Sequence, residues 1–155
     1  SYEDAKKMME ENEYDIVILD IMGVNGYELL RTANKRKFPA LMLTAHALSS
    51  EDLRRSAKEG AAYYAPKDEI EKIRYFVADV LEAIEKNKSP WQKMFDRLGS
   101  FYDKRFRGPE WREKEKKFWE KRSTNVFRIS SSVPPATYGQ EYKRRNIYLW
   151  GKVAC

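Results

Sequence analysis

The most informative stretch of this chain is Tyr14-Asp15-Ile16-Val17-Ile18-Leu19-Asp20, an almost unbroken apolar run that ends in a carboxylate. A short run of this kind, bounded by charged residues, indicates a strand buried on both faces, as in a parallel sheet under helices. The turn-forming residues Gly23, Asn25 and Gly26 follow Asp20. Because ligands of open α/β sheets bind at the carboxyl edge, the stretch predicts both a fold class and a reactive carboxylate.

Two further apolar runs extend this pattern. Residues 40–45 contain Thr44 near their end, and residues 63–67 end in Lys67. Segments with helical periodicity lie between these runs and after the last one. Their apolar positions are Tyr27, Leu29, Leu30, Leu53, Ala57, Ala61, Ile70, Ile73, Phe76, Val77, Val80, Leu81 and Ile84. The alternation of strand and helix predicts an α/β fold with a parallel sheet and right-handed crossovers. Asp20, Thr44 and Lys67 would then meet at one edge of that sheet.

Asp20, Thr44-Ala45 and Lys67, in this order on three successive strands, resemble the response-regulator receiver domain of two-component signalling. The resemblance covers residues 1–87 and implies a flavodoxin-like sheet and a phosphoprotein that is not an enzyme. It implies that Asp20 accepts a phosphoryl group from a histidine kinase or a phosphotransfer protein. Thr44 would sense the acyl phosphate, and Lys67 would pair with its oxygens. Tyr64 matches the aromatic switch of the family, which swings inward when the threonine moves.

The chemistry of these residue types suits phosphoryl transfer. A carboxylate needs no deprotonation before it attacks phosphorus. The phosphoryl group in flight carries spread negative charge, which a lysine and a hydroxyl can stabilise. The family also uses Mg²⁺, which prefers an octahedral shell of oxygen ligands. For this cofactor the resemblance implies Asp20 and the backbone carbonyl of Met22 as ligands.

The sequence departs from the receiver pattern at its beginning. A complete receiver starts with a strand that ends in adjacent acidic residues, which hold the metal. This chain opens at Ser1-Tyr2-Glu3-Asp4-Ala5, which resembles the second helix of the family. We therefore expect a fold that is incomplete at the N-terminus, in a piece of a longer protein that binds Mg²⁺ weakly. We interpret Glu3-Asp4 as helix capping rather than as a metal site. Two smaller departures are a shorter spacing from Asp20 to Gly26 and Asp68 in place of a proline.

Each candidate residue also has a simpler interpretation. Asp20 could cap the following turn, Thr44 could be an ordinary strand-end residue, and Lys67 could be a solvated surface lysine. Their joint placement favours a site. His46, the single histidine, precedes the helix-start signal at residues 49–52. We interpret it as a loop residue, because one histidine cannot hold a metal unaided.

The charge of the chain divides into two parts. The formal net charge is +6 over 155 residues, yet residues 1–88 carry −3 and residues 89–155 carry +9. All four tryptophans lie in the basic part. The single cysteine, Cys155, excludes an intramolecular disulfide framework and favours a reducing, cytoplasmic location. No apolar run approaches the length of a membrane span.

A boundary is predicted near residue 88, where Ser89 as N-cap and Pro90 as first helical residue start a new helix. A helical extension is predicted for residues 88–122, with a second helix over 110–122 after Gly108-Pro109. The first helix carries an apolar stripe formed by Trp91, Phe95, Leu98 and Tyr102, widened by Met94 and Phe101. Residues 123–155 are predicted to be an irregular basic and aromatic tail, in which 125–129 could form a short strand and 142–150 show no clear period.

The basic, aromatic part allows two interpretations. Cations interleaved with aromatic rings can bind single-stranded nucleic acid. The helical spacing of the stripe instead favours packing against the receiver-like part or against a second copy in a homodimer, which would also cover the sheet edge left by the missing strands. Two functional hypotheses result. The first is a phospho-receiver, and the second is a non-phosphorylated scaffold whose extension binds protein or nucleic acid.

Overall fold

The computed structural model describes residues 1–21, 24–45, 49–124 and 146–151, and it contains a four-stranded sheet in which all neighbouring strands are parallel. The strands lie in the order β3-β2-β1-β4. Their bounds are Ile16–Asp20 for β1, Ala40–Thr44 for β2, Tyr63–Pro66 for β3 and Ile147–Trp150 for β4. The predicted α/β class with a parallel sheet is therefore confirmed.

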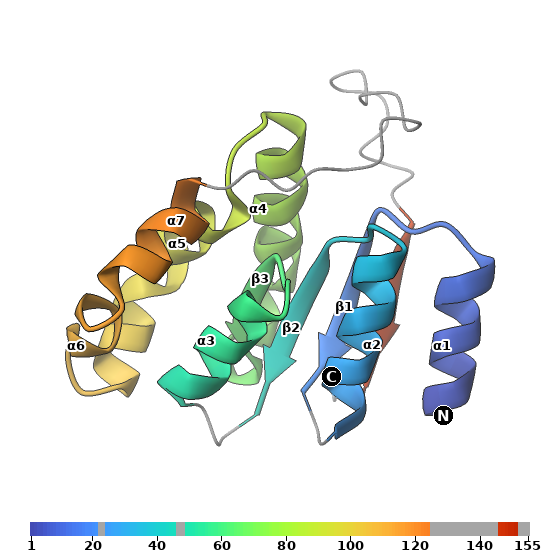
Figure 1. Cartoon of the computed structure of the whole chain (residues 1–155), viewed down its shortest axis with the longest axis horizontal. Coiled ribbons are helices and arrows are strands. Elements are labelled where there is room, and N and C mark those ends of the chain that lie inside the picture. Colours follow the sequence, from blue (N-terminus) through green and yellow to red (C-terminus); the bar gives the residue numbers. More distant parts are fainter. Residues whose placement is uncertain (22–23, 46–48, 125–145, 152–155) are drawn as a thin grey trace.

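Helices cover both faces of the sheet. Helices α1, α2 and α3 lie on one face, α4 lies on the other, and α5 to α7 lie beyond the β3 edge (Figure 1). Their bounds are Tyr2–Glu11 for α1, Val24–Lys35 for α2, Ser50–Lys58 for α3, Ile73–Glu85 for α4, Pro90–Arg105 for α5, Glu110–Glu113 for α6 and Lys116–Thr124 for α7. A 3-10 helix, η1 (Lys67–Lys72), precedes α4, so the predicted stripe from Ile70 is divided between these two elements. Within the described ranges, no helix combines the length and the apolar character that crossing a membrane requires.

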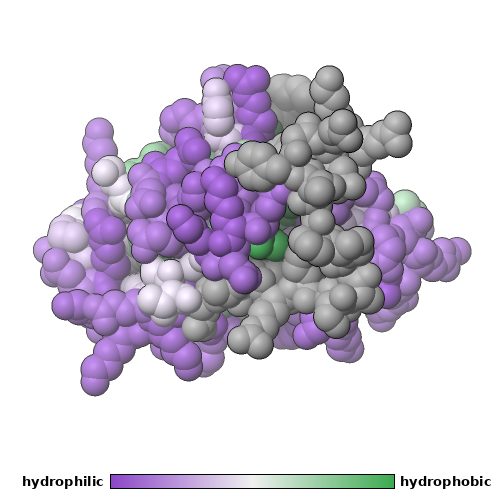
Figure 2. All heavy atoms as spheres, turned by 90° about the horizontal axis from the view of Figure 1, so that it is seen from above, coloured by the Kyte–Doolittle hydropathy of each residue, from purple (hydrophilic) through white to green (hydrophobic). Residues whose placement is uncertain are grey.

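The core forms around the three strands that the apolar runs predict. Every residue of β1, β2 and β3 is buried, as expected for strands covered on both faces. One hydrophobic cluster joins these strands to Met9 of α1, Leu30 of α2, Phe76 of α4 and Trp91 of α5. The surface at the amino edge of the sheet, in contrast, is mainly hydrophilic over the described residues (Figure 2). The extension thus shares the core of the receiver-like part.

Capping residues explain where several helices begin. Ser1 and Asp4 form a reciprocal capping box at the start of α1, which confirms the interpretation of the acidic pair. Ser49 accepts from the Asp52 amide at the start of α3. Helix α5 begins at Pro90 as predicted, but the Ser89 hydroxyl makes no capping bond. It donates instead to the Arg122 carbonyl at 2.6 Å and so ties the end of α7 to the start of α5.

The single helix predicted over 110–122 is wrong, because the structure contains two short helices separated by a turn at residues 114–115. Trp111 and Trp119 lie eight positions apart, which in a continuous helix would be about 12 Å along the axis. Their ring centroids are 5.7 Å apart, and both rings pack on Phe95 of α5. The break therefore lets both tryptophans join one aromatic cluster.

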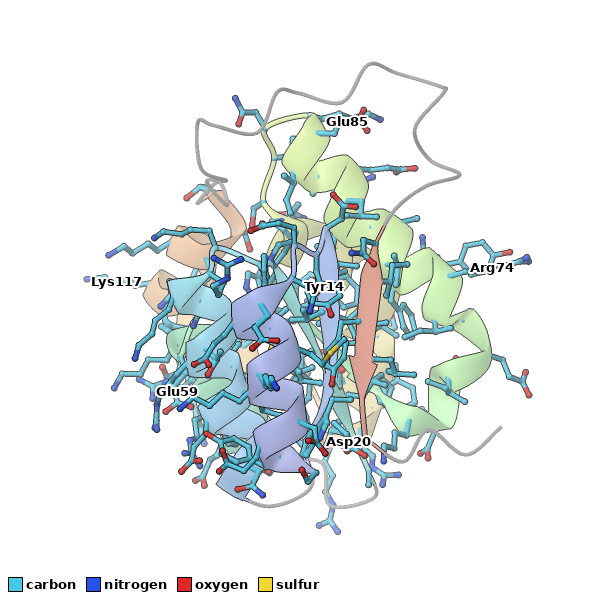
Figure 3. All side chains as sticks on the ribbon, turned by 90° about the vertical axis from the view of Figure 1, so that its right-hand side faces the viewer. Tyr14, Asp20, Glu59, Arg74, Glu85 and Lys117 are labelled. Carbon is cyan, nitrogen blue, oxygen red and sulfur yellow. The ribbon has the colours of Figure 1, made fainter. Side chains whose placement is uncertain are left out.

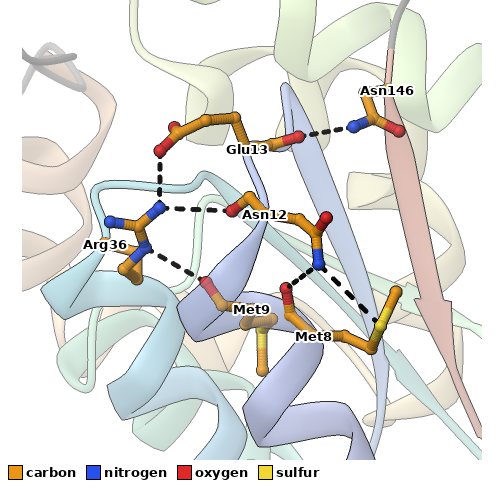
Figure 4. Close-up of polar contacts among 6 residues, drawn as sticks. All are labelled: Met8, Met9, Asn12, Glu13, Arg36 and Asn146. Atoms are coloured by element: carbon orange, nitrogen blue, oxygen red, sulfur yellow. Dashed lines mark hydrogen bonds and ion pairs between the residues drawn. The ribbon is translucent and has the colours of Figure 1, made fainter.

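The prediction of an irregular tail is wrong for its described end, where residues 147–150 form β4. This strand pairs in parallel with β1, from Ile16↔Ile147 to Leu19↔Trp150. Asn146 fixes its start, because its amide NH₂ donates to the Glu13 carbonyl beside the contacts of Arg36 with the end of α1 (Figure 4). The β1 edge that we expected to be exposed is thus covered by the chain itself. The strand considered for 125–129 lies outside the described residues, as do Met22 and His46.

An ion pair between the partly exposed Arg97 and the buried Asp79 fastens α5 to the rest of the molecule. Arg97 makes two bonds to Asp79 of α4, from Nε to Oδ2 at 2.6 Å and from Nη2 to Oδ1 at 2.9 Å, and the Tyr63 hydroxyl donates to Oδ2 at 2.7 Å. Two bonds from α5 also reach β3 and the residues just before it: Trp91 Nε1 donates to the Ala61 carbonyl and the Tyr102 hydroxyl to the Tyr64 carbonyl. The predicted packing of the aromatic stripe against the receiver-like part is confirmed.

We expect Arg97→Ala to lower the free energy of unfolding by about 1–3 kcal/mol, because Asp79 would remain buried without its cation. Arg97→Lys should lose less, since it keeps the charge but not the two-bond geometry. Urea unfolding followed by tryptophan fluorescence measures both. Lys104→Ala, at an exposed position of the same helix, is the control and should stay within about 0.5 kcal/mol. An Arg97→Ala variant as stable as this control would contradict the anchoring role.

Candidate functional site

The three predicted side chains come from adjacent strands at the carboxyl edge of the sheet. Asp20 ends β1, Thr44 ends β2, and Lys67 directly follows β3. The parallel register, which aligns Asp20 with Leu43, brings the three strand ends to one side. Figure 3 shows Asp20 at the end of β1, beside the end of β4. Lys67 Nζ lies 2.5 Å from Asp20 Oδ2, so the structure brings the predicted carboxylate and amine into direct contact.

Asp20 is almost completely buried, with 1% of its surface exposed, and its two oxygens have different surroundings. Oδ2 accepts from Lys67, whereas Oδ1 is buried and has no hydrogen-bond partner among the described residues. An unsatisfied buried acceptor is costly, by about 1–3 kcal/mol or more for a charged group. Of the simpler interpretations, the solvated surface lysine is wrong, because the Lys67 amine binds a buried carboxylate.

A second buried carboxylate in the same molecule provides a comparison. Asp79 is also buried, but both of its oxygens accept hydrogen bonds from Arg97 or Tyr63. Such saturation is normal for a carboxylate that only holds a structure together. Asp20 differs in having one oxygen left over at the edge where α/β proteins bind ligands. This difference distinguishes Asp20 from Asp79.

Thr44 and Tyr64 lie on neighbouring strands, and both are buried. Burial raises the pKa of Tyr64 well above its usual range, although the nearby Thr44 hydroxyl lowers it slightly. The geometry nevertheless gives the Tyr64 hydroxyl no hydrogen-bond partner within the described part of the chain. Tyr102 of α5 donates to the Tyr64 carbonyl at 2.7 Å, and the two rings are 6.0 Å apart. The predicted switch residue thus occupies an inward position and contacts the extension.

The residues present do not form a magnesium site of the expected kind. Asp20 offers one carboxylate, and Lys67 already occupies one of its oxygens and brings a positive charge. In the described part of the chain, no group of three or more His, Cys, Asp or Glu side chains could hold a metal ion. Asp4 caps α1, and Met22 lies outside the described residues.

One residue of the site, Gly151, escaped the sequence analysis. It follows β4 and has a φ of +128°, and a Cβ at this position would lie 2.2 Å from Asp20 Cβ. Only a glycine can therefore approach Asp20 this closely. The available signal was a glycine that directly follows the apolar residues 147–150.

No protein-family model matches this chain, and a search of curated proteins found no match.

Burial raises the pKa of Tyr63, Tyr64 and Tyr102 well above the usual range of tyrosine. Their neutral forms contribute stability that is fully present below the unfolded-state pKa of about 10 and is lost as pH rises above it. We expect Tyr64→Phe to make this alkaline loss shallower, by up to about 1.4 kcal/mol per pH unit. Unfolding in urea from pH 8 to 11 tests this. Tyr75→Phe, at an exposed position, should leave the slope unchanged, and equal slopes for both variants would contradict the expectation.

We expect magnesium to bind weakly. A single carboxylate that already contacts a lysine cannot readily displace the waters that Mg²⁺ holds. Titration with magnesium, followed by tryptophan fluorescence, should approach saturation only at high concentration. Asp20→Asn should give the same curve as the unaltered chain. Tight binding that Asp20→Asn abolishes would show that further ligands complete the site.

Proposed function

We propose that this chain is a phosphoacceptor module of the response-regulator receiver type, with a flavodoxin-like sheet, and that Asp20 is the acceptor. Its donor would be a histidine kinase or a phosphotransfer protein, and the chain would act as a signalling module rather than as an enzyme. The observation that carries the proposal is the 2.5 Å contact between Lys67 and Asp20 at the carboxyl edge, with Asp20 Oδ1 left unpartnered.

The proposed reaction is an in-line displacement at phosphorus. An oxygen of Asp20 forms the new P–O bond, and the bond from phosphorus to the leaving atom of the donor breaks, with its electron pair leaving on that atom. From a phosphohistidine donor the leaving atom is a ring nitrogen. Lys67 stabilises the negative charge on the phosphoryl oxygens, and the Thr44 hydroxyl can donate to one of them. A carboxylate needs no deprotonation before it attacks phosphorus, so the step requires no general base.

A route for the signal runs from the site to the extension. Thr44 and Tyr64 occupy adjacent strands, and the Tyr64 carbonyl accepts from Tyr102 of α5. The Tyr64 hydroxyl has no bond to lose in the described structure, so the ring can respond when Thr44 turns toward a phosphoryl group. Any movement of β3 would act on α5, which carries the ion pair of Arg97.

The second hypothesis, a non-phosphorylated scaffold, is favoured by the burial of Asp20 and by the single carboxylate at the edge. The version of this hypothesis in which the extension binds nucleic acid has less support. Base stacking requires exposed rings, whereas Trp91, Trp111 and Trp119 are buried in the aromatic cluster. A scaffold that binds a protein partner is thus the form that remains beside the phosphoacceptor.

We expect prolonged incubation with acetyl phosphate, with and without magnesium, to add one phosphoryl group to the chain, measured by intact mass. Asp20→Asn should add none. Asp68→Asn, an exposed carboxylate at the same edge, is the matched control and should be labelled like the unaltered chain. If Asp20→Asn is labelled as strongly as the unaltered chain, Asp20 is not the acceptor. If neither the unaltered chain nor any variant is labelled, the result favours the scaffold hypothesis.

A further inference from the structure

Residue Gly151, which directly follows β4, lies against the proposed acceptor. Gly151 lies so near Asp20 that an added Cβ would be 2.2 Å from Asp20 Cβ, 3.0 Å from Cγ and 2.9 Å from Oδ2. The contact is with the side chain itself, including the atoms that carry its reactivity. Figure 3 shows the end of β4 beside Asp20. Residues 146–151, here called the strap, therefore form one wall of the site.

A closed wall of this kind is incompatible with phosphoryl transfer. Reacting atoms must come within about 3–3.5 Å of each other in line with the bond that forms. Asp20 is only 1% exposed, so a phosphorus atom of a donor cannot reach either oxygen in the described arrangement. The Asp20 carboxylate is thus paired with Lys67 and is inaccessible to a phosphoryl donor in this arrangement.

The strap is the part of the sheet that we expect to detach at the lowest cost in free energy. Every residue of β1, β2 and β3 is buried, whereas Ile147 and Leu149 of β4 are 45% and 48% exposed. Strand β4 occupies the end of the strand order, and of the described strands it pairs with β1 alone. Its release would cost the β1 ladder, the bonds of Asn146 to Asp15 and Glu13, and the packing of Tyr148 and Trp150 against the core, while the pairing among β1, β2 and β3 would stay. Elements with few buried apolar contacts open at the lowest free energy.

We propose that the strap is an autoinhibitory element, with Gly151 as the residue that controls access to Asp20. The inference rests on the proposed function. In the open state an Asp20 oxygen attacks the phosphorus of the donor; with acetyl phosphate, the P–O bond to the acetyl group breaks and acetate leaves with the electron pair. In the closed state Gly151 occupies the approach to the carboxylate. A partner that captures β4 would switch the module on.

Gly151→Ala tests the proposal, because the new methyl group cannot coexist with Asp20 in the closed position and φ of +128° disfavours alanine. Gly108→Ala is a matched control: Gly108 has φ of +123° and an equally close contact, but with the flexible end of Glu110 in the extension. Two rates are measured. The first is amide formation at Asp20 by a water-soluble carbodiimide and an amine, read by peptide mass spectrometry. The second is labelling by acetyl phosphate.

We expect Gly151→Ala to raise both rates about tenfold, which corresponds to about 1.4 kcal/mol of strain in the closed state, and Gly108→Ala to change neither. Equal carbodiimide rates for the two variants and the unaltered chain would overturn the strap. If Gly151→Ala raises the carbodiimide rate while no variant accepts a phosphoryl group, the strap does control access to Asp20 but the proposed function is wrong.

A second variant protects the test against misfolding of Gly151→Ala, which circular dichroism would reveal. Asn146→Ala removes the side-chain bond to the Glu13 carbonyl at the far end of the strap and leaves the surroundings of Asp20 unchanged. It should raise the carbodiimide rate at Asp20 by a smaller factor. If Asp20 in this variant reacts no faster than in the unaltered chain, the strap is not held as we propose.

Discussion

Parallel pairing along both edges of β1 is the constraint on which the rest of the molecule depends. Strand β2 lies on one side and β4 on the other, in registers that bring all carboxyl ends to the same edge. Because parallel neighbours require crossovers on the faces, the helices must cover the sheet, and β1 is buried throughout. The last residue of this buried strand is Asp20, so the fold itself carries a carboxylate into a low-dielectric position.

The two buried carboxylates, Asp79 and Asp20, differ in how completely their oxygens are hydrogen-bonded. Each lies against a partly exposed cation, Asp79 against Arg97 and Asp20 against Lys67. Arg97 and Tyr63 satisfy both oxygens of Asp79, and the planar guanidinium fits that geometry. Lysine presents a single point charge and leaves one oxygen of Asp20 unpartnered. The fully hydrogen-bonded Asp79 anchors the extension, whereas Asp20 keeps an oxygen that our proposal assigns to phosphoryl transfer.

The extension is a structural part of the domain. Its aromatic side chains share one cluster with the core of the sheet, and hydrogen bonds from Trp91 and Tyr102 occupy carbonyls along β3 and just before it. These bonds reduce the unpaired backbone that the β3 edge would otherwise present. At the opposite side, β4 pairs with β1 and covers its edge. Among the described residues of the extension, Trp91, Trp111 and Trp119 thus lie in a buried aromatic cluster.

The sequence by itself determined the three apolar strands, their carboxyl-end residues Asp20, Thr44 and Lys67, and the buried stripe of α5, because these signals reside in local periodicity and in the residues that end each run. It failed for β4, for the break between α6 and α7, and for Gly151. Four residues of a strand whose partner lies about 130 positions away leave no periodic signal, and the break serves ring contacts that form only in the packed molecule. The burial of Asp20 was likewise determined by the tertiary structure. Burial of a carboxylate depends on which distant segment packs against it, and no pattern within residues 14–20 encodes the approach of Gly151.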